Sequence, residues 1–97
     1  MLDQGSDPTV LGYRDRIDDL DGRIVAALNE RIALVRELHA YKAAHGYATT
    51  DPGREESMVL ALQARNAGPL TDDGVRDLVV ALLRLTRHEL GRGGDGG

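Results

Sequence analysis

The sequence has no cysteine, no tryptophan and no phenylalanine, and its only aromatic residues are three tyrosines. The absence of cysteine excludes disulfides, thiolate metal ligands and cysteine nucleophiles. No apolar run approaches the ~18 residues of a membrane span, and the polar opening MLDQGSDPTV is unlike a signal peptide. We therefore expect a cytoplasmic protein that does not enter a membrane. The net charge of −4 argues against a general nucleic-acid surface.

Leucine and alanine dominate the hydrophobic part of the chain, which makes up 41% of the residues. Straight-chain and small apolar residues favour helices, whereas strands prefer β-branched and aromatic side chains. The 97 residues suffice for one small domain. We predict an all-α domain over residues 9–90, with a flexible lead-in at 1–8 and a flexible glycine-rich tail at 91–97.

The longest predicted element is a helix that begins at Pro8, with Asp7 as its N-cap, and runs to about His45, where Gly46 stops it. Apolar residues recur at helical spacing throughout this segment. About 35 residues make a rod of ~50 Å, whereas a globule of this size has a radius of gyration of ~12–13 Å. The rest of the chain is too short to cover the apolar stripe of such a rod. We therefore expect a second copy to share it, in a helical homodimer.

A second, shorter helix is predicted from Pro52 to about Asn66, with Thr50 or Asp51 as its cap. Its inward residues are expected to be Met58, Val59 and Leu62.

A third helix is predicted to begin after a cap at Thr71 or Asp72 and to end near Leu90. It carries apolar residues at helical spacing: Val75, Leu78, Val79, Leu82, Leu83 and Leu85.

Two cations lie on or beside the apolar stripe of the long helix. Arg31 is surrounded on its own face by apolar residues one turn away, which are Ala27, Leu28, Leu34 and Val35. Lys42, the only lysine, lies eleven residues further on and ~20° around the helix. One interpretation is that both side chains extend along apolar surface to water or pair with acids. The other is a buried anion site, because charge in a helical core is costly unless a polyanionic ligand neutralises it.

Further charged residues could serve the same pocket. Arg14 lies ~100° around the helix from Arg31, so it could reach a pocket only in the partner of an antiparallel dimer. Asp51, Arg54 and Glu55 gather at the start of the second helix, where a simple capping cluster is the plainer interpretation.

Residue patterns for other chemistries are missing from the sequence. The three histidines lack metal-ligand spacing, neither serine has a nucleophile-elbow context, and no glycine-rich phosphate loop occurs. We therefore expect no metal and no cofactor.

The run YRDRIDDLDGRIVAALNERIALVRELHAYKAAHG, followed by DPGREE, resembles the all-helical (AroQ-type) chorismate mutases. The likeness extends over roughly Leu11 to Leu90. Its elements are an R..ID..D opening, an ER pair seventeen residues after the first arginine, a lysine eleven further on, and then D..RE. The resemblance implies an intertwined homodimer with three helices per chain, one long and two shorter. The ending LLRLTRHELGRG is similar to the short actinobacterial δ subclass.

The resemblance also implies an activity, the Claisen rearrangement of chorismate to prephenate in phenylalanine and tyrosine biosynthesis. Arg31 would bind one carboxylate of chorismate, together with Arg14 of the other subunit. Lys42 would contact a carboxylate and the ether oxygen of the breaking C–O bond. Asp51 and Glu55 would hold the ring hydroxyl, and Arg54 would add positive potential.

The match is looser in the third helix. Well-known family members carry a hydroxyl residue there and, four residues later, a Gln or Glu that touches the ether oxygen. Thr86 can take the first position. The position of the Gln or Glu is occupied by Leu90, which cannot donate a hydrogen bond. Shifting the alignment by one residue would place Glu89 there.

Members of the δ subclass are activated by docking onto 3-deoxy-arabino-heptulosonate-7-phosphate synthase, and we expect the same partner here. Two alternatives stay open. A mutase or lyase for 4-amino-4-deoxychorismate or isochorismate would lack the acid found here at Glu55. A non-catalytic helical dimer that binds a partner enzyme would not need Arg31 and Lys42 to face inward.

Overall fold

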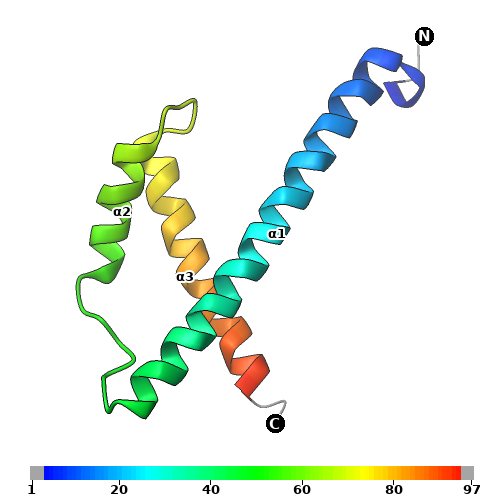
Figure 1. The fold of residues 1–97 in the computed structure, drawn as a ribbon. Coiled ribbons are helices and arrows are strands. Elements are labelled where there is room, and N and C mark those ends of the chain that lie inside the picture. Colours follow the sequence, from blue (N-terminus) through cyan, green and yellow to red (C-terminus); the bar gives the residue numbers. More distant parts are fainter. Residues whose placement is uncertain (1–3, 95–97) are drawn as a thin grey trace. The chain divides into compact units, whose positions relative to one another are not determined.

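The computed structural model describes residues 4–94 and contains three α-helices joined by short loops (Figure 1). After a turn of 3-10 helix at Gln4–Ser6, α1 spans Pro8–Ala44, α2 spans Arg54–Arg65 and α3 spans Asp72–Gly94. No strand occurs among the described residues. The all-α class, with one long and two shorter helices, is confirmed. The ends of the predicted lead-in and tail, residues 1–3 and 95–97, lie outside the described part of the chain.

The chain divides into two units, residues 1–34 and 35–97. The first unit contains the 3-10 turn and most of α1. The Asp7 side chain accepts a hydrogen bond from the backbone N–H of Thr9 (2.9 Å), and Pro8 occupies the first helical position. This confirms the predicted start of the long helix.

None of the 37 residues of α1 is buried. Leu28, Ile32 and Val35 are half-buried, but many of its other large apolar side chains are between 42% and 64% exposed, as seen for Leu11, Ile17, Leu20, Ile24, Leu34 and Leu38. At 1.5 Å per residue the helix is ~55 Å long. A long helix owes most of its stability to the burial of an apolar face, and α1 has no fully buried residue.

The second unit begins with the end of α1, which is closed by a Schellman motif. The N–H of Tyr47 donates to the C=O of Lys42 (2.8 Å), and the N–H of Gly46 donates to the C=O of Ala43 (3.3 Å). Gly46 adopts a left-handed conformation with a φ of 73°, which glycine tolerates better than other residues. Gly46 is therefore the stop that the sequence predicted, with the last helical residue at Ala44.

The predicted start of the second helix is wrong. Pro52 lies in a turn rather than in the helix, and neither Thr50 nor Asp51 caps it with a side chain. The N-cap is Gly53, whose φ of 85° is left-handed and cannot belong to a right-handed helix. A backbone hydrogen bond from Arg54 N–H to the C=O of Asp51 (3.1 Å) closes the turn, so α2 begins two residues later than predicted.

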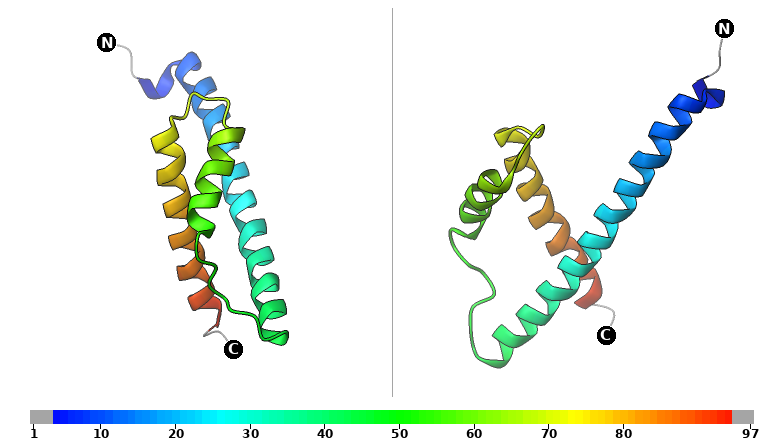
Figure 2. Two further views of the ribbon diagram at one scale, coloured as in Figure 1. Left: turned by 90° about the vertical axis from the view of Figure 1, so that its left-hand side faces the viewer. Right: turned by 45° about the horizontal axis from the view of Figure 1, so that its top comes forward.

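Helices α2 and α3 lie side by side and antiparallel, as both views of Figure 2 show, and they form the core of the second unit. Met58 and Val59 of α2 pack against Val79 of α3, and Leu62 and Leu83 extend this cluster. The inward residues predicted for the second helix are therefore confirmed. On α3, Val75 is also buried, whereas Leu78 and Leu85 stay exposed.

The start of α3 agrees with the sequence, but its end does not. The Thr71 hydroxyl accepts a hydrogen bond from Gly74 N–H (3.0 Å), as expected for a cap. The helix continues past the predicted end at Leu90 to Gly94. Glycine inside a helix costs only ~1 kcal/mol, and an ion pair between Arg92 and Glu89 (2.6 Å) lies across this last segment.

No helix within residues 4–94 carries an apolar stretch long enough to cross a membrane.

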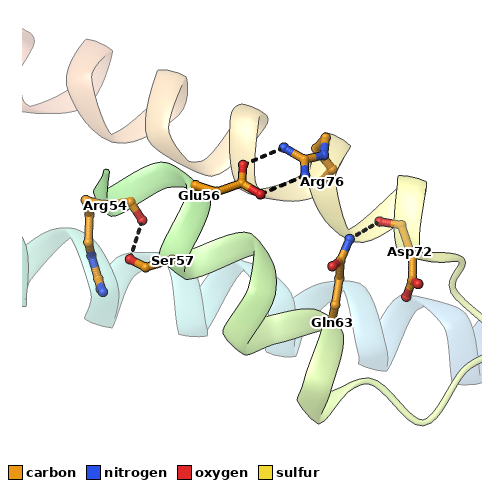
Figure 3. A network of polar contacts seen from close by, with 6 residues as sticks. All are labelled: Arg54, Glu56, Ser57, Gln63, Asp72 and Arg76. Atoms are coloured by element: carbon orange, nitrogen blue, oxygen red, sulfur yellow. Dashed lines mark hydrogen bonds and ion pairs between the residues drawn. The ribbon is translucent and has the colours of Figure 1, made fainter. Parts of the chain in front are cut away.

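Polar contacts join α2 to α3 on their exposed side (Figure 3). Arg76 donates two hydrogen bonds to the Glu56 carboxylate, at 2.9 and 3.1 Å. The Gln63 amide donates to the backbone C=O of Asp72 (3.1 Å). The hydrogen bonds and charge of Arg76 lower the pKa of Glu56 below its ordinary value of 4.5, and Glu56 raises the pKa of Arg76.

This ion pair predicts a pH-dependent contribution to stability. A carboxylate whose pKa is lowered by folding stabilises the fold above its ordinary pKa, and the contribution is lost as the pH falls through the lowered value. We expect Arg76→Ala to lower the thermal midpoint slightly at pH 7 and by less at pH 3, with Glu56→Gln following the same pattern. The control is Arg65→Ala, which removes an exposed arginine of α2 that forms no ion pair within residues 4–94. A deficit of equal size at both pH values would contradict the prediction.

Candidate active site

Lys42 lies in the last turn of α1 and is half-buried. Within residues 4–94 its ammonium group forms no hydrogen bond and no ion pair. Its backbone carbonyl accepts hydrogen bonds from the N–H groups of Tyr47 (2.8 Å) and His45 (3.2 Å). The backbone of Lys42 is thus fixed, while its positive charge remains available to an anion.

Arg31 is the other half-buried cation of α1, and it takes part in a polar interaction. All other arginines, aspartates and glutamates of α1 are exposed, including Arg14. The two cations that the sequence placed on or beside the apolar stripe therefore stand apart from the remaining charges of the helix. Arg14 and Arg31 belong to the first unit of the chain.

Three predicted site residues lie around the start of α2. Asp51 belongs to the preceding loop, and Arg54 and Glu55 are the first two residues of the helix. All three are exposed, so their charged groups are accessible to a ligand. The Asp51 and Arg54 backbones are joined directly by the hydrogen bond that closes the turn. The Arg54 carbonyl accepts a bond from the Ser57 hydroxyl (3.0 Å), which fixes the first turn of α2 (Figure 3).

Thr86 is the buried polar residue of α3, with 7% of its surface exposed. Its hydroxyl donates to the carbonyl of Leu82, one turn earlier (2.7 Å), and it takes part in a further interaction. Leu90, one turn later, is half-buried. The carboxylate of Glu89 accepts a hydrogen bond from Arg92, and its carbonyl accepts one from Arg36 of α1 (3.3 Å).

Five of the seven predicted site residues thus belong to the second unit: Lys42, Asp51, Arg54, Glu55 and Thr86. Of these, the structure links Asp51 directly to Arg54. The assignment of all seven to one site stays a prediction.

Two groups of neighbouring side chains were not predicted from the sequence. Tyr41, His45 and Tyr47 stack at the end of α1, and the four-residue spacing of the first two rings was the available signal. On α3, an open cavity of about 440 Å³ is lined by Val80, Arg84, Arg87 and His88. Their spacing of four, three and one residues is that of a single helical face.

The described residues contain no group of three or more histidine, aspartate or glutamate side chains placed to hold a metal ion. Cations such as Lys42 and Arg54 can bind and orient an anionic ligand, and they can stabilise charge that develops on it.

Comparison with known proteins identifies the family. Residues 13–89 match the family model for chorismate mutase type II. The chain is similar to the structure of chorismate mutase (form I) from Thermus thermophilus, with 31% identity and a TM-score of 0.76. The match covers 80% of this chain and 98% of the Thermus chain. The comparison with curated proteins gives no match.

These matches favour neither a sibling-substrate enzyme nor a non-catalytic dimer. The residues that carry the family pattern, from Arg14 to Glu55, fall within the matched region. The chain belongs to the chorismate mutase type II family and is an isomerase that rearranges chorismate to prephenate.

Proposed function

We propose that the cations of α1 and the charged start of α2 bind chorismate and promote its rearrangement. The observation that carries the proposal is the partial withdrawal from solvent of Arg31 and Lys42, on a helix whose other arginines and acids are exposed. Chorismate is a dicarboxylate, so one carboxylate can compensate the half-buried Lys42, and the other can bind at Arg31, which also takes part in an interaction within the chain.

The rearrangement is a pericyclic reaction in which the ether C–O bond breaks while a C–C bond forms, with no proton transfer. It needs no nucleophile and no cofactor. An enzyme can accelerate it by holding the folded, reactive conformer and by stabilising negative charge on the ether oxygen. In our proposal the Lys42 ammonium stabilises the negative charge on the ether oxygen. It lies on a fixed backbone and has no competing partner within residues 4–94.

The remaining residues orient the substrate. Arg31 binds one carboxylate, together with Arg14 of a second subunit. Asp51 and Glu55 hold the ring hydroxyl, and Arg54 adds positive potential beside them. Their position in the first turn of α2 and the loop before it supports this assignment, because the turn that ends at Gly53 links Asp51 to Arg54.

From α3, Thr86 is proposed to line the pocket. Its burial supports an inward position for the hydroxyl, and its bond to Leu82 fixes the rotamer. Leu90 contributes only apolar surface at the next turn, so Lys42 carries most of the stabilisation of the ether oxygen.

The active form is proposed to be an intertwined homodimer. The uncovered apolar stripe of α1 supports it, because a second α1 helix offers a matching stripe of equal length. In an antiparallel pair the start of one α1 lies beside the end of the other. Arg14 of one subunit can then reach the pocket of its partner.

Replacement of the proposed catalytic cation provides the first test. We expect Lys42→Ala to lower kcat/KM by about two to three orders of magnitude, the loss typical of removing one group that stabilises developing charge. The dimer should persist in size-exclusion chromatography. The control is Arg23→Ala, which removes an exposed arginine of the same helix and should leave turnover near wild type. Unchanged activity in Lys42→Ala would refute the proposed role.

A mixing experiment tests whether two subunits share each site. Arg14→Ala and Arg31→Ala should each be nearly inactive as homodimers. After joint unfolding and refolding, the heterodimer has one doubly damaged pocket and one intact pocket. Since about half of the refolded dimers are heterodimers with one intact site, activity should return to roughly a quarter of the wild-type value. If the mixture stays inactive although mass spectrometry shows heterodimers, the shared-site arrangement is excluded.

We also propose that 3-deoxy-arabino-heptulosonate-7-phosphate synthase activates this enzyme by docking. The glycines near the end of α3 support it, since each lowers helix stability by ~1 kcal/mol and leaves a segment that a partner can order further. Adding the purified synthase should raise kcat/KM for chorismate at least tenfold, whereas bovine serum albumin at the same concentration should not. An unchanged kcat/KM at saturating synthase would rule this activation out.

A further inference from the structure

Three aromatic side chains stack at the end of α1, and we refer to Tyr41, His45 and Tyr47 as the aromatic clamp. The ring centroids of Tyr41 and His45 are 4.0 Å apart, with an angle of 22° between the planes. The Tyr47 ring lies 5.9 Å from His45 and 6.5 Å from Tyr41. The imidazole Nδ1 of His45 is 2.9 Å from the Tyr41 carbonyl oxygen. The clamp therefore joins the last turn of the helix to the first loop residue beyond Gly46.

The clamp residue Tyr47 is hydrogen-bonded to the backbone of Lys42. Lys42 directly follows Tyr41, and its carbonyl accepts the N–H of Tyr47 at 2.8 Å. A last helical turn frays readily because its carbonyls lack partners within the helix. Here Tyr47 supplies the missing donor. Because its ring is stacked on the preceding turn, its N–H stays directed at Lys42.

We propose that Tyr47 is a positioning residue for Lys42. Its ring, stacked on His45 and near Tyr41, keeps the last turn of α1 closed, so the ammonium group starts from a fixed backbone. The inference rests on the proposed catalytic role of Lys42. It gives a physical reason for an aromatic cluster on exposed surface, since Tyr41 and Tyr47 are 56% and 59% exposed. Displacement of a catalytic group by about 1 Å can cost up to a hundredfold in rate.

The stacking of the rings, rather than the phenol hydroxyls, carries the effect. Within residues 4–94 neither Tyr41 nor Tyr47 forms a hydrogen bond through its hydroxyl group. Phenylalanine at position 47 should therefore preserve the clamp, whereas alanine should open it. Aromatic pairs of this kind contribute roughly 0.5–1.5 kcal/mol beyond the area they bury, so opening the clamp frees the terminal turn without unfolding the protein.

The kinetic test compares Tyr47→Ala and Tyr47→Phe with Thr49→Ala, a substitution in the same loop away from the rings. We expect kcat to fall about tenfold in Tyr47→Ala, with KM rising less than about threefold, because the remaining cations still bind substrate. Tyr47→Phe and Thr49→Ala should stay within about twofold of wild type. Wild-type kcat in Tyr47→Ala overturns the proposal, and so does an equal loss in Tyr47→Phe.

A second measurement on the ligand-free protein separates this inference from the proposed function. Opening the clamp should speed amide exchange at residue 47 in Tyr47→Ala, whereas exchange should stay unchanged in Tyr47→Phe. Unchanged exchange in Tyr47→Ala overturns the inference whatever the activity. If the wild type fails to convert chorismate while exchange responds as expected, the clamp stands and the proposed function falls.

Discussion

Positive charge on a helix face that is otherwise apolar is the constraint on which the proposed site depends. A cation withdrawn from water is tolerated when an anion compensates it, and α1 carries two such cations, Arg31 and Lys42, while its other arginines and acids remain in solvent. Neither position improves the packing of a helix pair. In the proposed site both bind a doubly charged ligand, and the same groups that select the ligand would then act on its reacting oxygen. Binding and catalysis thus have a common electrostatic origin in this small fold.

The distribution of burial supports the proposal that the fold and the site depend on association. The buried apolar residues, Met58, Val59, Val75 and Val79, all belong to α2 and α3. The longest helix contributes none of them. A chain of 97 residues has little interior to offer, and many large apolar side chains of α1 stay exposed. Because residues for binding the substrate occur on that same helix, the surface that would form a dimer and the surface that would form the pocket overlap.

Sequence reasoning succeeded where a local signal decides the structure. Asp7, Gly46 and Thr71 each satisfy orphan backbone groups at a helix end, so the predicted positions agree with the observed caps. It failed at the start of α2, because Pro52 is as compatible with a turn as with a helix and the left-handed Gly53 decides between them. It also failed at the end of α3, where the glycine-rich sequence predicted an end near Leu90 but the helix continues to Gly94. Spacing and the family resemblance predicted the charged residues of the proposed site, but not the aromatic clamp, since that depends on how the chain turns back at Gly46.

A pericyclic reaction is accelerated mainly by the exact placement of charged groups around the substrate. The segment between α1 and α2 is therefore important, because it fixes the backbones of two proposed site residues. Two left-handed glycines, Gly46 and Gly53, bound this segment. Lys42 is hydrogen-bonded to one end through Tyr47, and Arg54 is hydrogen-bonded to the other through Asp51. A change in either turn would therefore move a proposed catalytic charge without altering any side chain that touches the substrate. The geometry of these two turns is for this reason as much a part of the proposed catalytic apparatus as the charges themselves.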